Sequence, residues 1–148
     1  LLNLMRALQH ERGLAYLFIT HNLAVVEYLA DELAVMYLGR IVEEGPVERV
    51  LGVRAHPYTR ALLAAVPRVG AEHGEGARDH AADATTVGAT LELPSPLDPP
   101  AGCHFHPRCP QATDVCRASY PSVTEFSQGH RVRCHWPQLD DRLPAGRA

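Results

Sequence analysis

The four cysteines are the residues of this 148-residue chain whose type and spacing most clearly allow chemistry. Five, six and seventeen residues separate successive members of the set, which is Cys103, Cys109, Cys116 and Cys134. Disulfides are typical of small secreted scaffolds, and we expect them least because the sequence shows no charged-then-apolar leader. Zinc favours cysteine pairs about two to four residues apart, whereas widely spaced thiolates can wrap an iron-sulfur cluster. Spacing alone leaves zinc and iron-sulfur as nearly equal alternatives.

Other side chains near the cysteines could assist such a site. Pro107 and Pro110 would stiffen the loop around Cys109 and lower the entropy cost of presenting its sulfur. Four histidines are close enough in sequence to be substitute ligands, and we interpret each as a solvated group or a group around the site: His104, His106, His130 and His135. Four arginines could offset the charge of the thiolates or be ordinary solvated charges: Arg108, Arg117, Arg131 and Arg133.

His21 is a second position with possible chemistry. The preceding residues 14–20 are almost all apolar, which predicts a strand covered on both faces in a parallel sheet. Asn22 can cap a helix that follows. Open α/β sheets bind ligands just beyond the carboxyl ends of their strands, where an imidazole can donate a hydrogen bond to a phosphate oxygen. The alternative is a histidine that merely closes a strand.

Composition excludes several classes of function. All 14 basic residues are arginine, so the chain contains neither a GxxxxGK[ST] phosphate-binding loop nor a Schiff-base lysine. A net charge of -3 gives no reason to propose a nucleic-acid partner. No apolar run is long enough to span a bilayer. Because Leu1 stands in place of Met and an amphipathic pattern is already running there, we expect an upstream part.

Periodicity and turn residues predict the elements that must position these side chains. The predicted elements are a helix at 1–12 ended by Gly13, the strand at 14–20, a helix from Asn22 to about residue 31, strands at 33–38 and 40–43 with a turn at Gly39, and helices at 46–51 and 57–67. This order is typical of the end of an α/β layered domain. The composition then shifts to Gly, Ala, His and acidic residues, which predicts a mobile linker before the proline-rich cysteine segment.

The first part of the chain resembles the end of an ABC-transporter ATPase domain. The resemblance rests on LFITHNL at 17–23, Ala-Asp before a strand and VMYLGRIVEEGP at 35–46, and it covers residues 1 to about 51. It implies that His21 contacts the terminal phosphate of ATP and helps position the attacking water. Asn22 stands where that family more often has Asp; it keeps the capping ability, so we expect little change in mechanism. The family's phosphate-binding loop, glutamine loop, signature segment and catalytic carboxylate all come earlier, so we expect the chain alone not to hydrolyse ATP.

Two further segments resemble one branch of that family. HPYTRALL at 56–63 followed by AVP has an ordinary explanation as a proline-initiated helix, but the whole string resembles the segment that marks the oligopeptide and dipeptide permease branch. This implies peptide cargo, with nickel or certain sugars in related systems, and no catalytic role for the segment. The cysteine segment, with residues 93–110 and GHRV at 129–132, resembles the C-terminal extension of the same branch. In members with all four cysteines the resemblance implies a [4Fe-4S] cluster, with zinc as the alternative.

We therefore interpret the fold class as α/β: the C-terminal portion of an ABC ATPase domain (parallel strand, helix, strand hairpin, helices) followed by a loop-rich, cysteine-containing extension. The expected parts are the ATPase end at 1–51, a helical HPYT segment at 52–68, a flexible linker at 69–90 and the Pro/Cys-rich extension at 91–148. The resemblance implies a subunit that binds and hydrolyses ATP with Mg²⁺, peripheral on the cytoplasmic face of the cell membrane. The implied partners are a second ATP-binding subunit, membrane-spanning permease subunits and, indirectly, a peptide-binding protein.

Two other interpretations remain open at this point. The chain could be a free-standing iron-sulfur or zinc-binding module without ATPase activity, in which residues 1–68 serve as scaffold. That hypothesis predicts a start codon close to Leu1 and metal-dependent folding of residues 91–140. A truncated reading frame without function is the third possibility.

Overall fold

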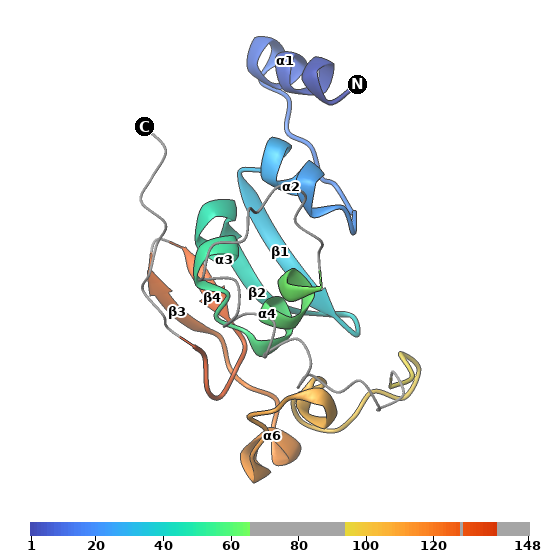
Figure 1. Ribbon diagram of the computed structural model, residues 1–148, viewed down its shortest axis with the longest axis vertical. Helices are drawn as coiled ribbons and strands as arrows, with labels where there is room; N and C mark the ends of the chain where they lie inside the picture. The colour runs from blue at the N-terminus through green and yellow to red at the C-terminus, as the bar shows by residue number, and fades with distance from the viewer. Residues whose placement is uncertain (66–93, 128, 139–148) are drawn as a thin grey trace, which may run out of the picture.

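One four-stranded antiparallel sheet organises the described part of the chain, which is residues 1–65, 94–127 and 129–138 of a computed structural model (Figure 1). The strands lie in the order β1-β2-β4-β3, and their bounds are β1 Glu32–Tyr37, β2 Arg40–Pro46, β3 Thr124–Ser127 and β4 His130–Val132. The central pair joins segments far apart in sequence, because Glu43 of β2 lies opposite Val132 of β4. The cysteine-containing segment therefore completes the same sheet that the ATPase-like segment begins.

The β1–β2 hairpin forms where the turn at Gly39 predicts it. Leu38 and Gly39 are the two loop residues and have φ values of 43° and 75°. Two successive positive φ values match the twist of a two-residue hairpin, and glycine adopts them without a Cβ clash. At the other end of β2, Gly45 permits a close approach, because a Cβ there would lie 2.9 Å from the Cα of His130 in β4. Glycine at this position lets the two strands meet.

Four helices precede the undescribed stretch 66–93, and they confirm the predicted helices to within a few residues. Their bounds are α1 Leu2–Arg12, α2 Leu23–Leu29, α3 Val47–Val53 and α4 Pro57–Ala64. Gly13 ends α1 in a left-handed conformation with φ 62°, and Asn22 caps α2 by accepting a hydrogen bond from the Ala24 N–H at 3.1 Å. The predicted end of the fourth helix at Pro67 and the predicted linker at 69–90 lie outside the described residues.

The predicted parallel strand at residues 14–20 is wrong. These residues form no strand, and the side chains of Leu17 and Ile19 are 93% and 98% exposed. An apolar run becomes a strand only when neighbouring strands accept and donate its backbone hydrogen bonds. Every strand of the described residues pairs antiparallel within the one sheet, and none lies beside 14–20. His21 consequently follows an extended, exposed segment.

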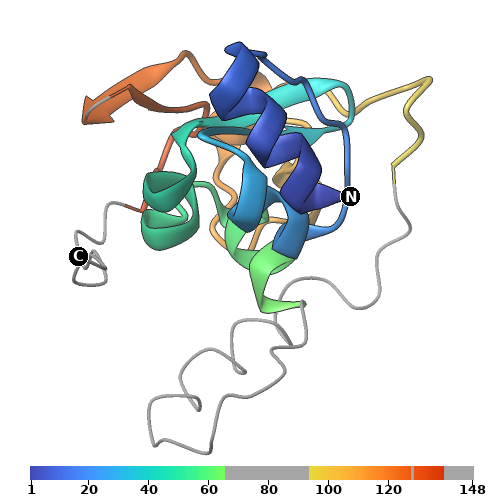
Figure 2. The ribbon, with the colours of Figure 1, turned by 90° about the horizontal axis from the view of Figure 1, so that it is seen from above.

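A residue of the cysteine segment completes the main core. Phe105 is 1% exposed and lies in one cluster with Val35, Tyr37, Val42 and Val50. Its ring centroid is 5.2 Å from that of Tyr37, in an edge-on arrangement. Helices α3 and α4 lie on one face of the sheet in both views (Figures 1 and 2). The core is thus shared by both halves of the described chain.

Helix α1 lies over α2 and contacts it through polar groups (Figure 2). It contributes no buried residue. The Tyr28 hydroxyl donates to the Asn3 side chain at 2.6 Å, and the Arg6 guanidinium donates to the Tyr28 carbonyl at 2.6 Å. Leu1 and Leu4 remain exposed. Among the described residues, no helix combines the length and the apolar character needed to cross a membrane.

The described residues after 93 include a short helix next to one cysteine and a short helix that contains another. The 3-10 helix η2, His106–Arg108, is directly followed by Cys109, and helix α6, Asp114–Ala118, contains Cys116. Figure 1 places α6 at the opposite end of the molecule from α1. These helices and the end of β4 surround the site described next.

Candidate functional site

All four predicted cysteines line one pocket. The pocket is formed by η2, α6, the residues after β4 and the start of α4, and its lining is Cys103, Cys109, Cys116, Cys134, His56, Pro57, Phe105, His106, Gln111, His135 and Trp136. Cys116 is buried, and the other three cysteines are partly buried. The structure thus brings to one pocket the side chain of Cys116 in α6 and those of three cysteines in the surrounding loops.

Backbone contacts hold the cysteine segments against one another. The Cys103 N–H donates to the Cys116 carbonyl at 2.8 Å, and the Cys109 N–H donates to the His106 carbonyl at 3.3 Å. Gly102 permits the first contact. Gly102 has a φ of 68°. A Cβ at this position would clash with the carbonyl oxygen of Cys116 and would lie 2.6 Å from the carbonyl oxygen of Arg117. Glycine at 102 is therefore a condition for placing Cys103 beside Cys116.

Burial favours the protonated form of three of the four thiols. It raises the pKa of Cys103, Cys109 and Cys134 above the ordinary value, for Cys134 to about 12, and the charges of neighbouring cysteines act in the same direction. A metal or cluster that binds here must displace these protons, which couples binding to pH. Within the described ranges, no group of three or more His, Cys, Asp or Glu side chains is arranged to hold a metal ion. The donor set suits an iron-sulfur cluster, but the sulfurs would have to be drawn into place around it.

Two of the four predicted assisting histidines line the pocket. His106 is fixed by a hydrogen bond from Nδ1 to the Cys103 carbonyl at 2.9 Å, and His135 by one from Nε2 to the Ser119 carbonyl at 3.0 Å. A carbonyl oxygen only accepts, so each of these rings donates its proton there. His104 packs its ring against Tyr120, with centroids 5.6 Å apart, and does not line the pocket.

Of the arginines near the cysteines, three have partners elsewhere. Arg117 forms an exposed ion pair with Asp114 at 2.8 Å, and Arg131 pairs with Glu44 at 3.3 Å. Arg133 donates to the Ile41 carbonyl at 3.3 Å. None of these three contacts involves a sulfur atom.

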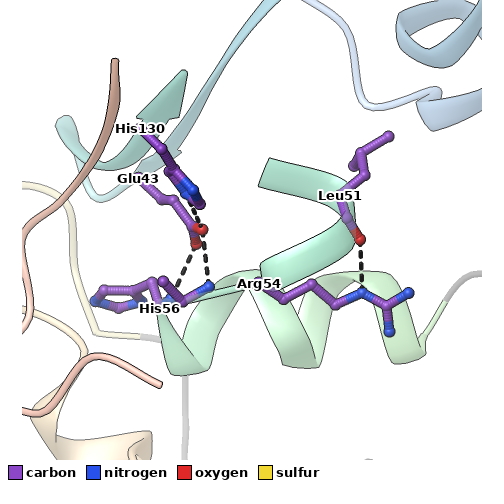
Figure 3. Close-up of polar contacts among 6 residues, drawn as sticks. Glu43, Leu51, Arg54, His56 and His130 are labelled. Carbon is purple, nitrogen blue, oxygen red and sulfur yellow. Dashed lines mark hydrogen bonds and ion pairs between the residues drawn. The ribbon is translucent and has the colours of Figure 1, made fainter. Parts of the chain in front are cut away.

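A buried carboxylate that sequence reasoning missed connects β2, β4 and the start of α4. Glu43 is fully buried; its Oε1 accepts from the Ala55 N–H at 2.8 Å and its Oε2 from the His56 N–H at 2.9 Å (Figure 3). The Nε2 of His130, also fully buried, lies 2.8 Å from Oε1. The interpretation of His130 as a solvated group or a group around the cysteines is wrong. The buried His130 ring contacts Glu43, and His130 does not line the cysteine pocket. The sequence gives little signal of this, because Glu43 stands between Val42 and a second glutamate, Glu44, which is only partly buried.

His56 belongs to this connection and also lines the cysteine pocket. Its Nδ1 accepts from the Tyr58 N–H at 3.0 Å, which caps α4. Burial lowers the pKa of His56 from 6.5 to about 4, against the opposing effect of the Glu43 charge, so the ring is neutral near pH 7. In Figure 3 the ring points away from the Glu43 carboxylate, on the side of the cysteine-containing segments.

His21, the predicted phosphate contact, lies at some remove from this pocket, exposed at the start of α2. The preceding Thr20 hydroxyl accepts from the Asn22 N–H at 3.0 Å, and Asn22 caps the helix. The local turn is therefore well defined although the strand before it does not form. The four cysteines and His21 therefore lie in two separate parts of the structure.

Comparison with known proteins decides the family. Residues 42–116, half of the chain, match the family described as "Oligopeptide/dipeptide transporter, C-terminal region". The chain belongs to this family. The match begins in β2 and ends at Cys116, so it includes Glu43, His56 and three of the four cysteines.

Relatives of this oligopeptide/dipeptide transporter region support the same conclusion. The dipeptide transport ATP-binding protein DppF of Haemophilus influenzae is 45% identical over 90% of this chain and 38% of its own length. The probable peptide ABC transporter ATP-binding protein y4tS of Sinorhizobium fredii is 47% identical over 91% of this chain and 36% of its own. DppF of Escherichia coli is 44% identical over 95% and 39%. The chain thus spans less than two fifths of these relatives, and the resemblance to the C-terminal part of a peptide-type ABC ATP-binding subunit is confirmed.

Proposed function

We propose that this chain is the C-terminal part of the ATP-binding subunit of an ABC importer for oligopeptides or dipeptides. The observation that carries the proposal is the 44–47% identity, over nine tenths of the chain, to proteins named as dipeptide or peptide transport ATP-binding proteins. The whole subunit would bind ATP with Mg²⁺ and use its hydrolysis to power transport. The 148 residues contain no lysine, and so no phosphate-binding loop; the chain alone should therefore be inactive.

His21 is the residue we assign to ATP within that subunit. Its exposed imidazole stands at the start of α2, on a turn fixed by the Asn22 cap. One ring nitrogen would donate to the terminal phosphate and help orient the attacking water, while Mg²⁺ and backbone donors outside this chain supply the remaining charge stabilisation. The exposed apolar side chains of Leu17 and Ile19 fit this assignment, because other parts of the whole subunit would cover them.

The partners follow from the same proposal. A second ATP-binding subunit would complete the nucleotide site around His21. ATP hydrolysis at the cytoplasmic face of the membrane would drive the membrane-spanning permease subunits. A peptide-binding protein would deliver cargo to those permease subunits. The subunit itself would be peripheral to the membrane.

We further propose that Cys103, Cys109, Cys116 and Cys134 hold a [4Fe-4S] cluster. The support is that all four line one pocket beside largely apolar side chains, in a donor set of four thiols. When bound, the cluster would supply a structural brace or a redox-sensitive group. Cys103 and Cys116 are already held together through the backbone, which reduces the rearrangement needed.

Replacing His21 by alanine in the longer subunit tests the ATPase assignment. We expect turnover to fall by about 100-fold or more, the usual effect of removing one group that stabilises a transition state, while ATP binding persists. His10→Ala, in α1, is the matched control and should leave turnover unchanged. Full turnover in His21→Ala would refute the assignment.

Metal analysis of the 148-residue chain tests the cluster. After anaerobic reconstitution, we expect about four iron and four sulfide per chain with visible absorption, and loss of both in Cys109→Ser. Stoichiometric zinc with a colourless protein would contradict the cluster. That result would favour zinc as the bound metal.

A further inference from the structure

His56 has a hydrogen-bond donor that the described residues leave unused. The ring is 1% exposed, and its Nδ1 accepts from the Tyr58 N–H at 3.0 Å. A neutral imidazole carries one proton, so an accepting Nδ1 places that proton on Nε2. The Nε2 is buried and has no hydrogen-bond partner among the described residues. Buried donors of folded proteins are nearly always paired, so an unpaired one indicates a missing acceptor.

The pocket that His56 lines contains the four cysteines, which are the natural acceptors. The ring cannot easily turn away from them. Its backbone N–H is held by Glu43 Oε2 at 2.9 Å, its Nδ1 caps α4, and its face packs near Phe105 with centroids 5.8 Å apart. Contacts with β2, with α4 and with the segment before η2 therefore hold the His56 ring in place.

The other two histidines of the pocket each have one ring nitrogen committed to a backbone carbonyl. His106 donates its proton to the Cys103 carbonyl and His135 donates its own to the Ser119 carbonyl. Among the histidines that line the pocket, His56 alone has a buried ring nitrogen without a hydrogen-bond partner in the described part of the chain.

We propose that His56 donates an Nε2–H···S hydrogen bond to a sulfur of the group held by the four cysteines and thereby raises its reduction potential. This inference rests on the proposed cluster. Hydrogen bonds to the sulfurs withdraw electron density and stabilise the reduced, more negative state, which is one of the means by which proteins set cluster potentials. His56 is thus a residue that tunes the cluster and does not coordinate it.

Two substitutions separate the tuning role from the capping role. His56→Asn places its amide oxygen near the position of Nδ1, so it keeps the cap of α4 and removes the Nε2 donor. His56→Gln places its amide nitrogen near the position of Nε2, so it keeps a donor and loses the cap. His135→Gln is the matched control, because it changes another pocket-lining histidine but preserves the donor to the Ser119 carbonyl.

The measurement is the midpoint potential of the reconstituted 148-residue chain, together with its iron and sulfide content. We expect His56→Asn to carry a full cluster with a more negative potential, His56→Gln to recover part of the shift, and His135→Gln to match the unsubstituted chain. A full cluster at unchanged potential in His56→Asn would overturn the inference and leave the cluster intact. Failure of the unsubstituted chain to take up iron and sulfide would overturn the cluster and the inference with it.

A measurement on the unsubstituted protein keeps the inference testable if the variants do not fold. With histidine labelled by ¹⁵N, electron-nuclear spectroscopy of the reduced cluster should show a weak coupling to one protonated ring nitrogen. The coupling should persist in His135→Gln. A reduced cluster with no coupling to histidine nitrogen would overturn the inference.

Discussion

Replacing Glu43 by glutamine keeps the shape of a buried side chain but removes its charge and one of its acceptors. The carboxylate accepts hydrogen bonds from the Ala55 and His56 N–H groups and from His130, at 2.8 to 2.9 Å. These donors belong to the start of α4 and to β4, so the substitution acts where the two halves of the described chain join. We expect it to weaken the whole sheet.

The magnitude follows from the number of bonds. The amide NH2 of glutamine would face at least one buried donor, and leaving that donor unpaired costs about 1–3 kcal/mol. The two remaining bonds change from charged to neutral, which removes about 1 kcal/mol each. We therefore expect Glu43→Gln to lower the free energy of unfolding by about 3–5 kcal/mol, a large fraction of the stability of a small domain.

Urea unfolding followed by circular dichroism measures this change, with Glu44→Gln as the matched control. Glu44 is the next residue of β2, but its ion pair with Arg131 at 3.3 Å is partly exposed. Such pairs contribute about 0–1 kcal/mol. If Glu43→Gln destabilises the chain no more than Glu44→Gln does, the reasoning from the buried carboxylate is refuted.

Two further substitutions test the construction of the cysteine pocket and the core. Gly102→Ala should destabilise the chain by about 1–3 kcal/mol more than Gly39→Ala, because both glycines have positive φ but only a Cβ at 102 meets backbone oxygens. Iron uptake should fall only in Gly102→Ala. Equal urea midpoints for the two variants would contradict this expectation. Phe105→Ala should lower the free energy of unfolding by about 3–5 kcal/mol, since the ring is buried against Tyr37. The control Val115→Ala should lower it by less than about 1 kcal/mol, because Val115 is partly exposed. Similar decreases for the two variants would show that Phe105 is not a core residue.

Local signals predicted the elements that depend on local contacts. The helix stop at Gly13, the Asn22 cap and the turn at Gly39 were all predictable, because each depends on the conformational freedom or the side chain of one residue. The grouping of the four cysteines was expected from their type. Their common pocket depends on the backbone approach at Gly102, which spacing alone does not reveal.

The features that could not be predicted from the sequence depend on pairing between residues far apart in the chain. Residues 14–20 have the composition of a buried strand, but composition does not create the neighbouring strand that would take its hydrogen bonds. The pairing of β4 with β2, and the contact of His130 with Glu43, join residues 87 positions apart. A buried carboxylate is recognisable only when its donors are known, so Glu43 and the second role of His56 required the structure.

The central claim is that this chain is the C-terminal part of a longer ATP-binding subunit, and the coding sequence upstream of Leu1 tests it most directly. We expect a continuous reading frame that encodes a GxxxxGK[ST] phosphate-binding loop and a signature segment before residue 1. A start codon close to Leu1, with no such loop in the upstream frame, would contradict this assignment and favour a free-standing metal-binding module.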